Sequence, residues 1–194
     1  MIEGAVRLLA TKGVEGTSFA EVLAATETPR GSVYHHFPGG KAELLHAAMD
    51  LASERAMAAM EPTRGQPAPA VVERFLGSWR ALLDYSDITA GCAVVAVTVA
   101  ADDDELRDHA GAIFRGWTEY LTGLFAAGGL EGPSAGQLAA TVIAAAEGVV
   151  ALCRAERSLE PFDAVSATLI RLTASLTEGP SASRSGKSSR RRGR

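Results

Sequence analysis

The chain is 194 residues long, with 47% hydrophobic and 22% charged residues and a formal net charge of -4. This composition is typical of a globular protein with a buried core and excludes a wholly disordered chain. The longest nearly apolar run, residues 90–101, is too short to cross a bilayer, and the first turn mixes an acid with a base. We therefore expect neither a signal peptide nor a transmembrane segment, and no membrane partner.

The first part of the chain predicts a series of short helices. Apolar residues recur at helical spacing from Ile2 to Leu9 and stop before Gly13, which is typical of a helix that ends at a glycine. Ser18 and Glu21 form a capping box, and this pattern predicts that a second helix begins there.

Prolines and glycines delimit the next two helices. Pro29 suits the first turn of a third helix, which we expect to run to Phe37, where residues 38–40 (Pro-Gly-Gly) end it. Lys41 then opens a fourth helix whose apolar residues continue to Leu51. The second and third helices are thus separated only by a short turn.

Beyond a predicted linker at residues 62–69, apolar residues from Val72 to Leu83 predict a fifth helix. Residues 91–100 are ambiguous, because their β-branched run suits a buried strand as well as a helix. No partner strand is predicted, so a short buried helix is expected. Acids at 102–104 begin a long helix, whose dipole they favour, and the run lacks the glycine of a calcium loop.

Two apolar stripes mark the last two helices. They consist of Leu138, Val142, Ala145, Val149 and Leu152, and of Phe162, Val165, Leu169, Leu172 and Leu176. Small residues permit close helix approach, so we expect these helices to form a four-helix interface between two copies of the chain, a homodimer. The alternative is that both stripes pack only within one chain.

The end of the chain differs sharply in charge from the rest. Residues 179–194 contain no acid and six basic residues, whereas the remainder has 13 basic against 23 acidic residues, a net of -10. This segment has no large apolar residue to bury, so a disordered basic tail is predicted. The two cysteines, Cys92 and Cys153, have no metal-like spacing and suit a reducing cytoplasm, so we expect no metal and no cofactor.

The third predicted helix carries a chemically mixed face. On a helical wheel Val33 and Phe37 point inward, while Arg30, Tyr34 and His35 share the outer side with Gly31. Arginine can bind guanine in a bidentate manner, and hydroxyl and imidazole groups can donate to phosphate oxygens. A short helix, a tight turn and this helix together predict a helix-turn-helix whose second helix reads DNA.

At these residues the chain resembles the TetR family of bacterial transcriptional regulators, whose signature matches residues 31–37 (Gly-Ser-Val-Tyr-His-His-Phe) followed by Lys41. Residues 29–41 together with residues 91–100, which begin with Gly91-Cys92, resemble more narrowly the LmrA/YxaF-type branch. The resemblance covers about residues 2–178. It implies an all-α homodimer that represses by binding a palindromic operator and releases it when a small molecule fills the C-terminal domain.

The resemblance implies two domains, and it also implies which residues contact DNA and which contact the effector. It implies a three-helix DNA-binding domain at residues 1–55 and a helical ligand-binding and dimerisation domain at residues 56–178. The DNA contacts would come from Ser18, Arg30, Gly31, Ser32, Tyr34, His35 and Lys41. A mostly apolar or aromatic effector would contact Phe75, Trp79, Cys92, Phe114, Trp117 and Tyr120, with polar tips from Tyr120, Thr118 or Cys92.

Two departures from the family pattern concern the DNA-binding head. The turn at residues 26–28 places Glu27 at a position that favours a positive φ, at a cost of roughly 1 kcal/mol. Residues 1–55 also hold five basic against seven acidic residues, so the head is net negative.

Other functions fit the sequence less well. His35 and His36 are adjacent and point different ways on a helix, so they do not form a metal site. Gly39 and Gly40 follow a helix rather than a strand, unlike a phosphate loop. Nothing in the sequence brings Cys92 and His109 together as a catalytic pair. We expect no enzyme; the alternative is a helical small-molecule-binding protein or enzyme that keeps the head as a relic.

Overall fold

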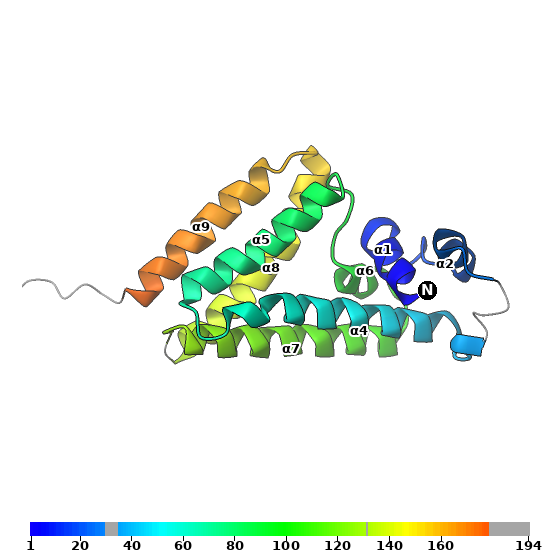
Figure 1. The fold of residues 1–194 in the computed structure, drawn as a ribbon, viewed down its shortest axis with the longest axis horizontal. Coiled ribbons are helices and arrows are strands. Elements are labelled where there is room, and N and C mark those ends of the chain that lie inside the picture. Colours follow the sequence, from blue (N-terminus) through cyan, green and yellow to red (C-terminus); the bar gives the residue numbers. More distant parts are fainter. Residues whose placement is uncertain (30–34, 131, 179–194) are drawn as a thin grey trace, which may run out of the picture.

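The computed structural model describes residues 1–29, 35–130 and 132–178, and within these ranges the chain is helical with no strand (Figure 1). The elements are α1 (Ile2–Lys12), α2 (Phe19–Thr26), α4 (Gly40–Met60), the 3-10 turn η1 (Glu61–Thr63), α5 (Ala68–Tyr85), α6 (Ala93–Ala100), α7 (Asp104–Ala127), α8 (Pro133–Glu156) and α9 (Glu160–Thr177). The predicted all-α class is confirmed. The predicted basic tail, residues 179–194, lies outside the described residues.

The predicted helix boundaries at the start of the chain hold, with one difference at α2. Helix α1 ends at Gly13, whose φ is 71°, and Ser18 Oγ accepts a hydrogen bond from the Glu21 backbone N–H at 3.2 Å. The Glu21 carboxylate accepts instead from Lys12 Nζ at 3.0 Å. The predicted capping box is therefore only half formed, because a nearby cation holds the carboxylate that was expected to return to Ser18.

The turn after α2 has the backbone conformation that the sequence predicts. Glu27 caps α2 with φ 52° and ψ 32°, in the left-handed region. A side chain with a Cβ is strained there, and glycine or asparagine is the usual occupant. The head thus stores a small strain in its turn.

Two clusters of buried side chains form the core, and both use α7. One lies among α1, α2, α4, α6 and the first half of α7, and the other lies among α5, α8, α9 and the second half of α7. Trp117 and Phe114 pack against both clusters. Helix α4 runs along α7 and supplies buried residues to each cluster, and the predicted boundary between residues 55 and 56 falls inside this continuous helix (Figure 1).

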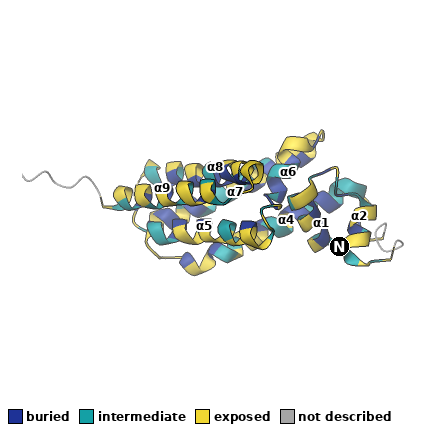
Figure 2. Cartoon of the chain, turned by 90° about the horizontal axis from the view of Figure 1, so that it is seen from above, coloured by how far each residue is buried: buried dark blue, intermediate teal, exposed yellow. Residues whose placement is uncertain are grey.

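Residues 93–100 form a helix, as predicted, but they are buried on one face only. Val94 and Val97 are fully buried, whereas Val99 is 81% exposed. Among the described helices, α8 is long and apolar enough to cross a membrane, with 24 residues and an 18-residue window of mean hydropathy 1.7. Here it packs against α7 and α9, with buried faces turned inward, as a core helix does (Figure 2).

Candidate functional site

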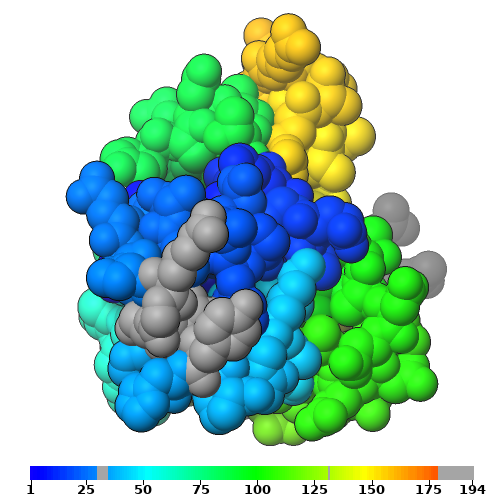
Figure 3. Space-filling model, turned by 90° about the vertical axis from the view of Figure 1, so that its right-hand side faces the viewer, coloured from blue at the N-terminus to red at the C-terminus, as the bar shows by residue number. Residues whose placement is uncertain are grey.

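The predicted DNA-reading helix falls largely outside the described residues. Arg30, Gly31, Ser32 and Tyr34 belong to the undescribed range 30–34. Of the neighbouring residues, His35 is exposed in a helical turn, and Phe37 is buried in the head. Figure 3 shows the end of the molecule where α1, α2 and the start of α4 lie together.

The cations of the head are partly neutralised by its own carboxylates. Lys12 pairs with Glu21, and Arg55 pairs with Glu3. In the described part of the head, Arg7 and Lys41 have no ion-pair partner, and Lys41 lies in the first turn of α4 next to the reader segment. Ser18, the other predicted DNA contact that is described, uses its Oγ to cap α2. Among the predicted DNA contacts that are described, Lys41 thus keeps an unpaired ammonium group.

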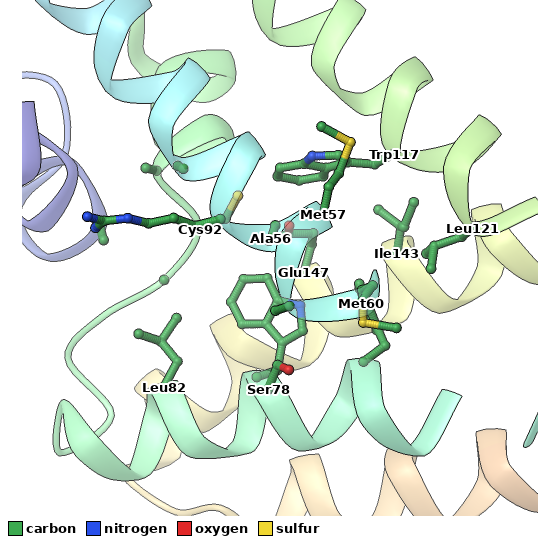
Figure 4. Close-up of a pocket in the computed structure, with 18 of the residues that line it drawn as sticks. Ala56, Met57, Met60, Ser78, Leu82, Cys92, Trp117, Leu121, Ile143 and Glu147 are labelled. Atoms are coloured by element: carbon green, nitrogen blue, oxygen red, sulfur yellow. The ribbon is translucent and has the colours of Figure 1, made fainter. Parts of the chain in front are cut away.

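A cavity of about 270 Å³ lies between the head and the C-terminal helices (Figure 4). Five of the six predicted ligand contacts line it: Phe75 and Trp79 from α5, Cys92 from the segment before α6, and Trp117 and Tyr120 from α7. The sixth, Phe114, does not. Its ring packs edge-on against that of Trp117, with centroids 5.2 Å apart and planes at 85°, so Phe114 contacts a lining residue without lining the cavity itself.

The remaining walls come from helices that the sequence did not connect with a ligand. Val6 and Ala10 of α1, Met57 and Met60 of α4, and Ile143 and Glu147 of α8 all line the cavity. Apart from Glu147 these residues look like ordinary core in the sequence. Glu147 did carry a signal, because it is the only charged residue between positions 132 and 153.

Most polar groups of the aromatic side chains that line the cavity already have a hydrogen-bond partner within the protein. Trp117 Nε1–H donates to Ser53 Oγ at 2.9 Å, and the Tyr120 hydroxyl donates to Glu61. Thr118, a predicted polar tip, donates to the Phe114 carbonyl at 2.8 Å and does not line the cavity. The Trp79 indole N–H has no acceptor among the described residues. The cavity therefore offers aromatic surface with few free polar groups.

Two titratable side chains meet at the wall, Glu147 and Cys92. Burial raises the pKa of Glu147 to about 7, although a hydrogen bond with the Cys92 thiol acts in the opposite direction. Burial also raises the pKa of the thiol, and the charge of Glu147 raises it further. Cys92 is therefore a protonated donor and lacks the thiolate of a nucleophile.

The pair that might have suggested catalysis is not brought together. His109 Nε2 lies 2.7 Å from Asp50 Oδ1, and its ring packs edge-on against His46 with centroids 4.6 Å apart. Neither histidine lines the cavity that holds Cys92.

The cavity adjoins the junction between the head and the body of the molecule. The Gly91 backbone N–H donates to the Ala10 carbonyl at 2.8 Å, which ties the segment before α6 to the end of α1. Ala10, Gly91, Cys92 and Glu147 also line a second cavity of about 370 Å³ on the other side of this contact. An occupant of the first cavity thus contacts Ala10 of the head directly, and it also contacts Gly91, which is hydrogen-bonded to Ala10.

Comparison with known proteins shows which family has this arrangement. Residues 67–168 match the family described as "Transcriptional regulator LmrA/YxaF-like, C-terminal domain", and residues 1–48 match "Bacterial regulatory proteins, tetR family". The chain belongs to the TetR family. An uncharacterised HTH-type transcriptional regulator of Mycobacterium tuberculosis is 33% identical over 191 residues, which cover 95% of this chain and 96% of the relative.

Solved structures of TetR regulators share the fold. The regulator from Legionella pneumophila superposes with a TM-score of 0.77 at 20% identity and covers 88% of this chain and 94% of its own. The regulator from Chloroflexus aurantiacus gives 0.73 at 26% identity, over 89% and 91%. An N-terminal helix-turn-helix head and a C-terminal helical domain, as predicted, are therefore confirmed, and the chain is a TetR-family DNA-binding transcriptional regulator of the LmrA/YxaF-like branch. The TetR fold supports operator binding by a homodimer.

Proposed function

We propose that this regulator is a repressor in the bacterial cytoplasm that leaves a palindromic operator when a small molecule fills the cavity. The observation that carries the proposal is the position of the cavity. Its wall includes α1 and α4 of the head as well as α5, α7 and α8 of the body. A ligand in this cavity contacts both the head and the body, so its affinity can differ between two orientations of the head. Such a difference in affinity is what a ligand needs to shift an equilibrium between two conformations.

The operator contacts proposed for the head are those that the sequence predicts. Arg30 is proposed to read a base edge, and Tyr34, His35 and Lys41 to hold phosphates, with Ser18, Gly31 and Ser32 at the same surface. The free Lys41 ammonium next to the reader segment supports this assignment.

The homodimer is proposed to form through α8 and α9. The stripes of the two helices are divided between two environments: Leu138, Val142 and Leu169 are buried within the chain, whereas Leu152, Leu172 and Leu176 are 52%, 44% and 43% exposed. The exposed leucines would be covered by the same helices of a second copy, which gives a four-helix interface with two-fold symmetry.

The proposal is tested with labelled DNA from the intergenic region beside the regulator's own gene. We expect the full chain to bind one segment with a site size suited to a dimer, at a salt where random DNA of equal length stays free. A compound that fills the cavity should release that DNA. Failure to prefer any segment over random DNA would contradict the operator role, and a cavity ligand that leaves DNA affinity unchanged would contradict the release mechanism.

The described residues give no support to an enzyme that keeps a relic head. Cys92 holds its proton, and His109 is engaged by Asp50 outside the cavity. We therefore propose no catalytic activity for this chain.

A further inference from the structure

We propose that the cavity is built for a small lipophilic cation, an ammonium group on an apolar or aromatic body, and that Glu147 is its countercharge. This inference rests on the proposed function in one respect only, that the cavity is the effector site.

The first argument is the charge inside the cavity. Of the residues that line it, only Arg55 and Glu147 carry a formal charge. Arg55 pairs with Glu3 of α1, and its side chain is 54% exposed, so its charge is neutralised at the edge of the cavity. Glu147 has no ion-pair partner among the described residues, and the Cys92 thiol is hydrogen-bonded to it. Lys12 and Arg154 line the second cavity, which Glu147 also borders, and Lys12 is paired with Glu21. The inner wall thus presents a single unpaired acid.

The second argument is the aromatic surface around this acid. Phe75, Trp79, Trp117 and Tyr120 come from two helices and line the same space. The face of an aromatic ring, and of tryptophan above all, attracts an ammonium group, and such rings are the usual recognition surface for quaternary ammonium ligands. Figure 4 shows Trp117 of α7, Cys92 of the segment before α6 and Glu147 of α8 around the same interior.

An anionic effector does not fit this surface. Most of the donors that could hold an anion are already used: Trp117 donates to Ser53, Tyr120 donates to Glu61, and Arg55 pairs with Glu3. Among the described lining residues the Trp79 indole N–H remains without an acceptor, and one neutral N–H does not balance a buried anion. Ser78, another lining residue, donates to the Arg74 carbonyl at 3.0 Å. A carboxylate or phosphate would meet Glu147 without a compensating donor network, and burying an unpaired charge beside a like charge is costly.

A neutral effector is distinguished from a cation by its dependence on pH. With a pKa of about 7, the Glu147 carboxyl is close to half ionised in the empty cavity at neutral pH. A cation binds the carboxylate form, so its affinity rises with pH. A neutral ligand leaves the acid in the form that burial favours, so its affinity stays level or falls as the pH rises.

The cavity also limits the size of the occupant. Its volume of about 270 Å³ lies at the lower end of the range for ligand pockets, roughly 300 to 1,000 Å³. A single ring with a compact ammonium group suits this space better than a large polycyclic compound.

The experiment compares two probes of nearly equal shape, phenyltrimethylammonium and the neutral tert-butylbenzene, on the full chain. Trp79 and Trp117 are the only two tryptophans, so emission reports on the cavity directly, and titration calorimetry gives the affinities. We expect the cation to bind at least tenfold more tightly than its neutral counterpart at pH 8. Between pH 8 and pH 6 its affinity should fall by about tenfold, as protonation of a group near pKa 7 competes.

The variant Glu147→Gln should remove both the preference for the cation and its pH dependence. Glu119→Gln is the matched control: it deletes an exposed carboxylate on α7 outside the cavity and should keep both. Equal binding of the two probes by the wild type, or an unchanged preference in a folded Glu147→Gln, would overturn the proposal. Should Glu147→Gln fail to fold, the wild-type pH profiles of the two probes decide the matter alone.

Operator binding is measured on the same samples. A chain that binds its operator but shows no preference for the cation contradicts only this inference. A chain that binds the cation and no DNA contradicts the proposed function instead.

Discussion

Glu27 is the residue of the described DNA-binding head at which the side chain and the backbone conformation are in conflict; Asp87, Ile88 and Arg157 also have a positive φ, but they lie in the body of the molecule. Its φ of 52° places a Cβ in the left-handed region, immediately before the segment that is proposed to read DNA. The strain of that conformation is of order 1 kcal/mol, and glycine or asparagine relieves it. The turn is therefore less stable with Glu27 than it would be with glycine or asparagine at the same position.

We expect Glu27→Asn to raise the free energy of unfolding by about 0.5 to 1 kcal/mol, because asparagine tolerates the left-handed region and loses less chain entropy than glycine. Urea denaturation followed by circular dichroism measures the change. Glu27→Ala removes the same charge but retains the Cβ strain, so it should show no such gain. A gain of equal size in Glu27→Ala would assign the effect to charge rather than to strain.

A second prediction at this scale concerns the proposed roles of Arg30 and Lys41. Arg30→Ala should cost about 1 to 3 kcal/mol of operator affinity and relax the preference at one base position in each half-site, since a base contact carries sequence information. Lys41→Ala should weaken all sequences alike, because a phosphate contact carries none. Fluorescence anisotropy on a panel of operator mutants separates the two, and an unaltered base preference in Arg30→Ala contradicts the assignment.

At the scale of elements, the outer faces of α8 and α9 carry three of the exposed large apolar side chains of the described residues. Leu152, Leu172 and Leu176 leave the core and face solvent. A glutamate among them should break the proposed four-helix interface, because a charge buried there has no partner.

We expect Leu172→Glu to convert the dimer to a monomer and to reduce operator affinity by more than tenfold, since two half-sites are then no longer bound together. Light scattering coupled to gel filtration reports the mass. Val99→Glu on α6 is the control, because it introduces the same charge at another exposed apolar residue. A dimer that persists in Leu172→Glu would locate the interface elsewhere.

The sequence predicts these elements well where one local signal decides them. Glycine and serine mark the ends of α1 and α2, and the exposed leucines of α9 follow from their own periodicity. The cavity was only partly predictable. Periodicity shows which face of a helix is apolar, but whether that face meets a neighbour or an empty space depends on tertiary packing, so Met57 and Ile143 could not be distinguished from plain core.

At the scale of the whole molecule, charge is separated along the chain. Residues 1–55 are net negative, and the six cations at the end of the sequence are the largest basic group in it. Arg55 and Lys12, which could have served DNA, are paired with Glu3 and Glu21. The tail is therefore a candidate source of the attraction to DNA that the head lacks.

Removal of residues 179–194 should flatten the slope of log affinity against log salt concentration by about 5 per chain if all six cations engage phosphates, and by less if only some do. Sequence preference should survive, because a flexible basic segment has no fixed geometry for base edges. Anisotropy titrations between low and moderate salt measure both. An identical slope and identical non-specific affinity in the shortened chain would show that the tail stays away from DNA.

The wall that α1 supplies to the cavity, through Val6 and Ala10, bears on how such regulators can be recombined. A chimera that joins the head of one relative to the body of another would import Val6 and Ala10 of the proposed effector site along with the new operator specificity, and a fusion after residue 55 would import Ala52 and Arg55 as well. If the cavity is the effector site, as proposed, an exchange of the head changes the inducer range together with the operator choice. An engineered fusion at residue 48 would need Val6 and Ala10 restored, and one after residue 55 also Ala52 and Arg55, before the original inducer could be expected to act.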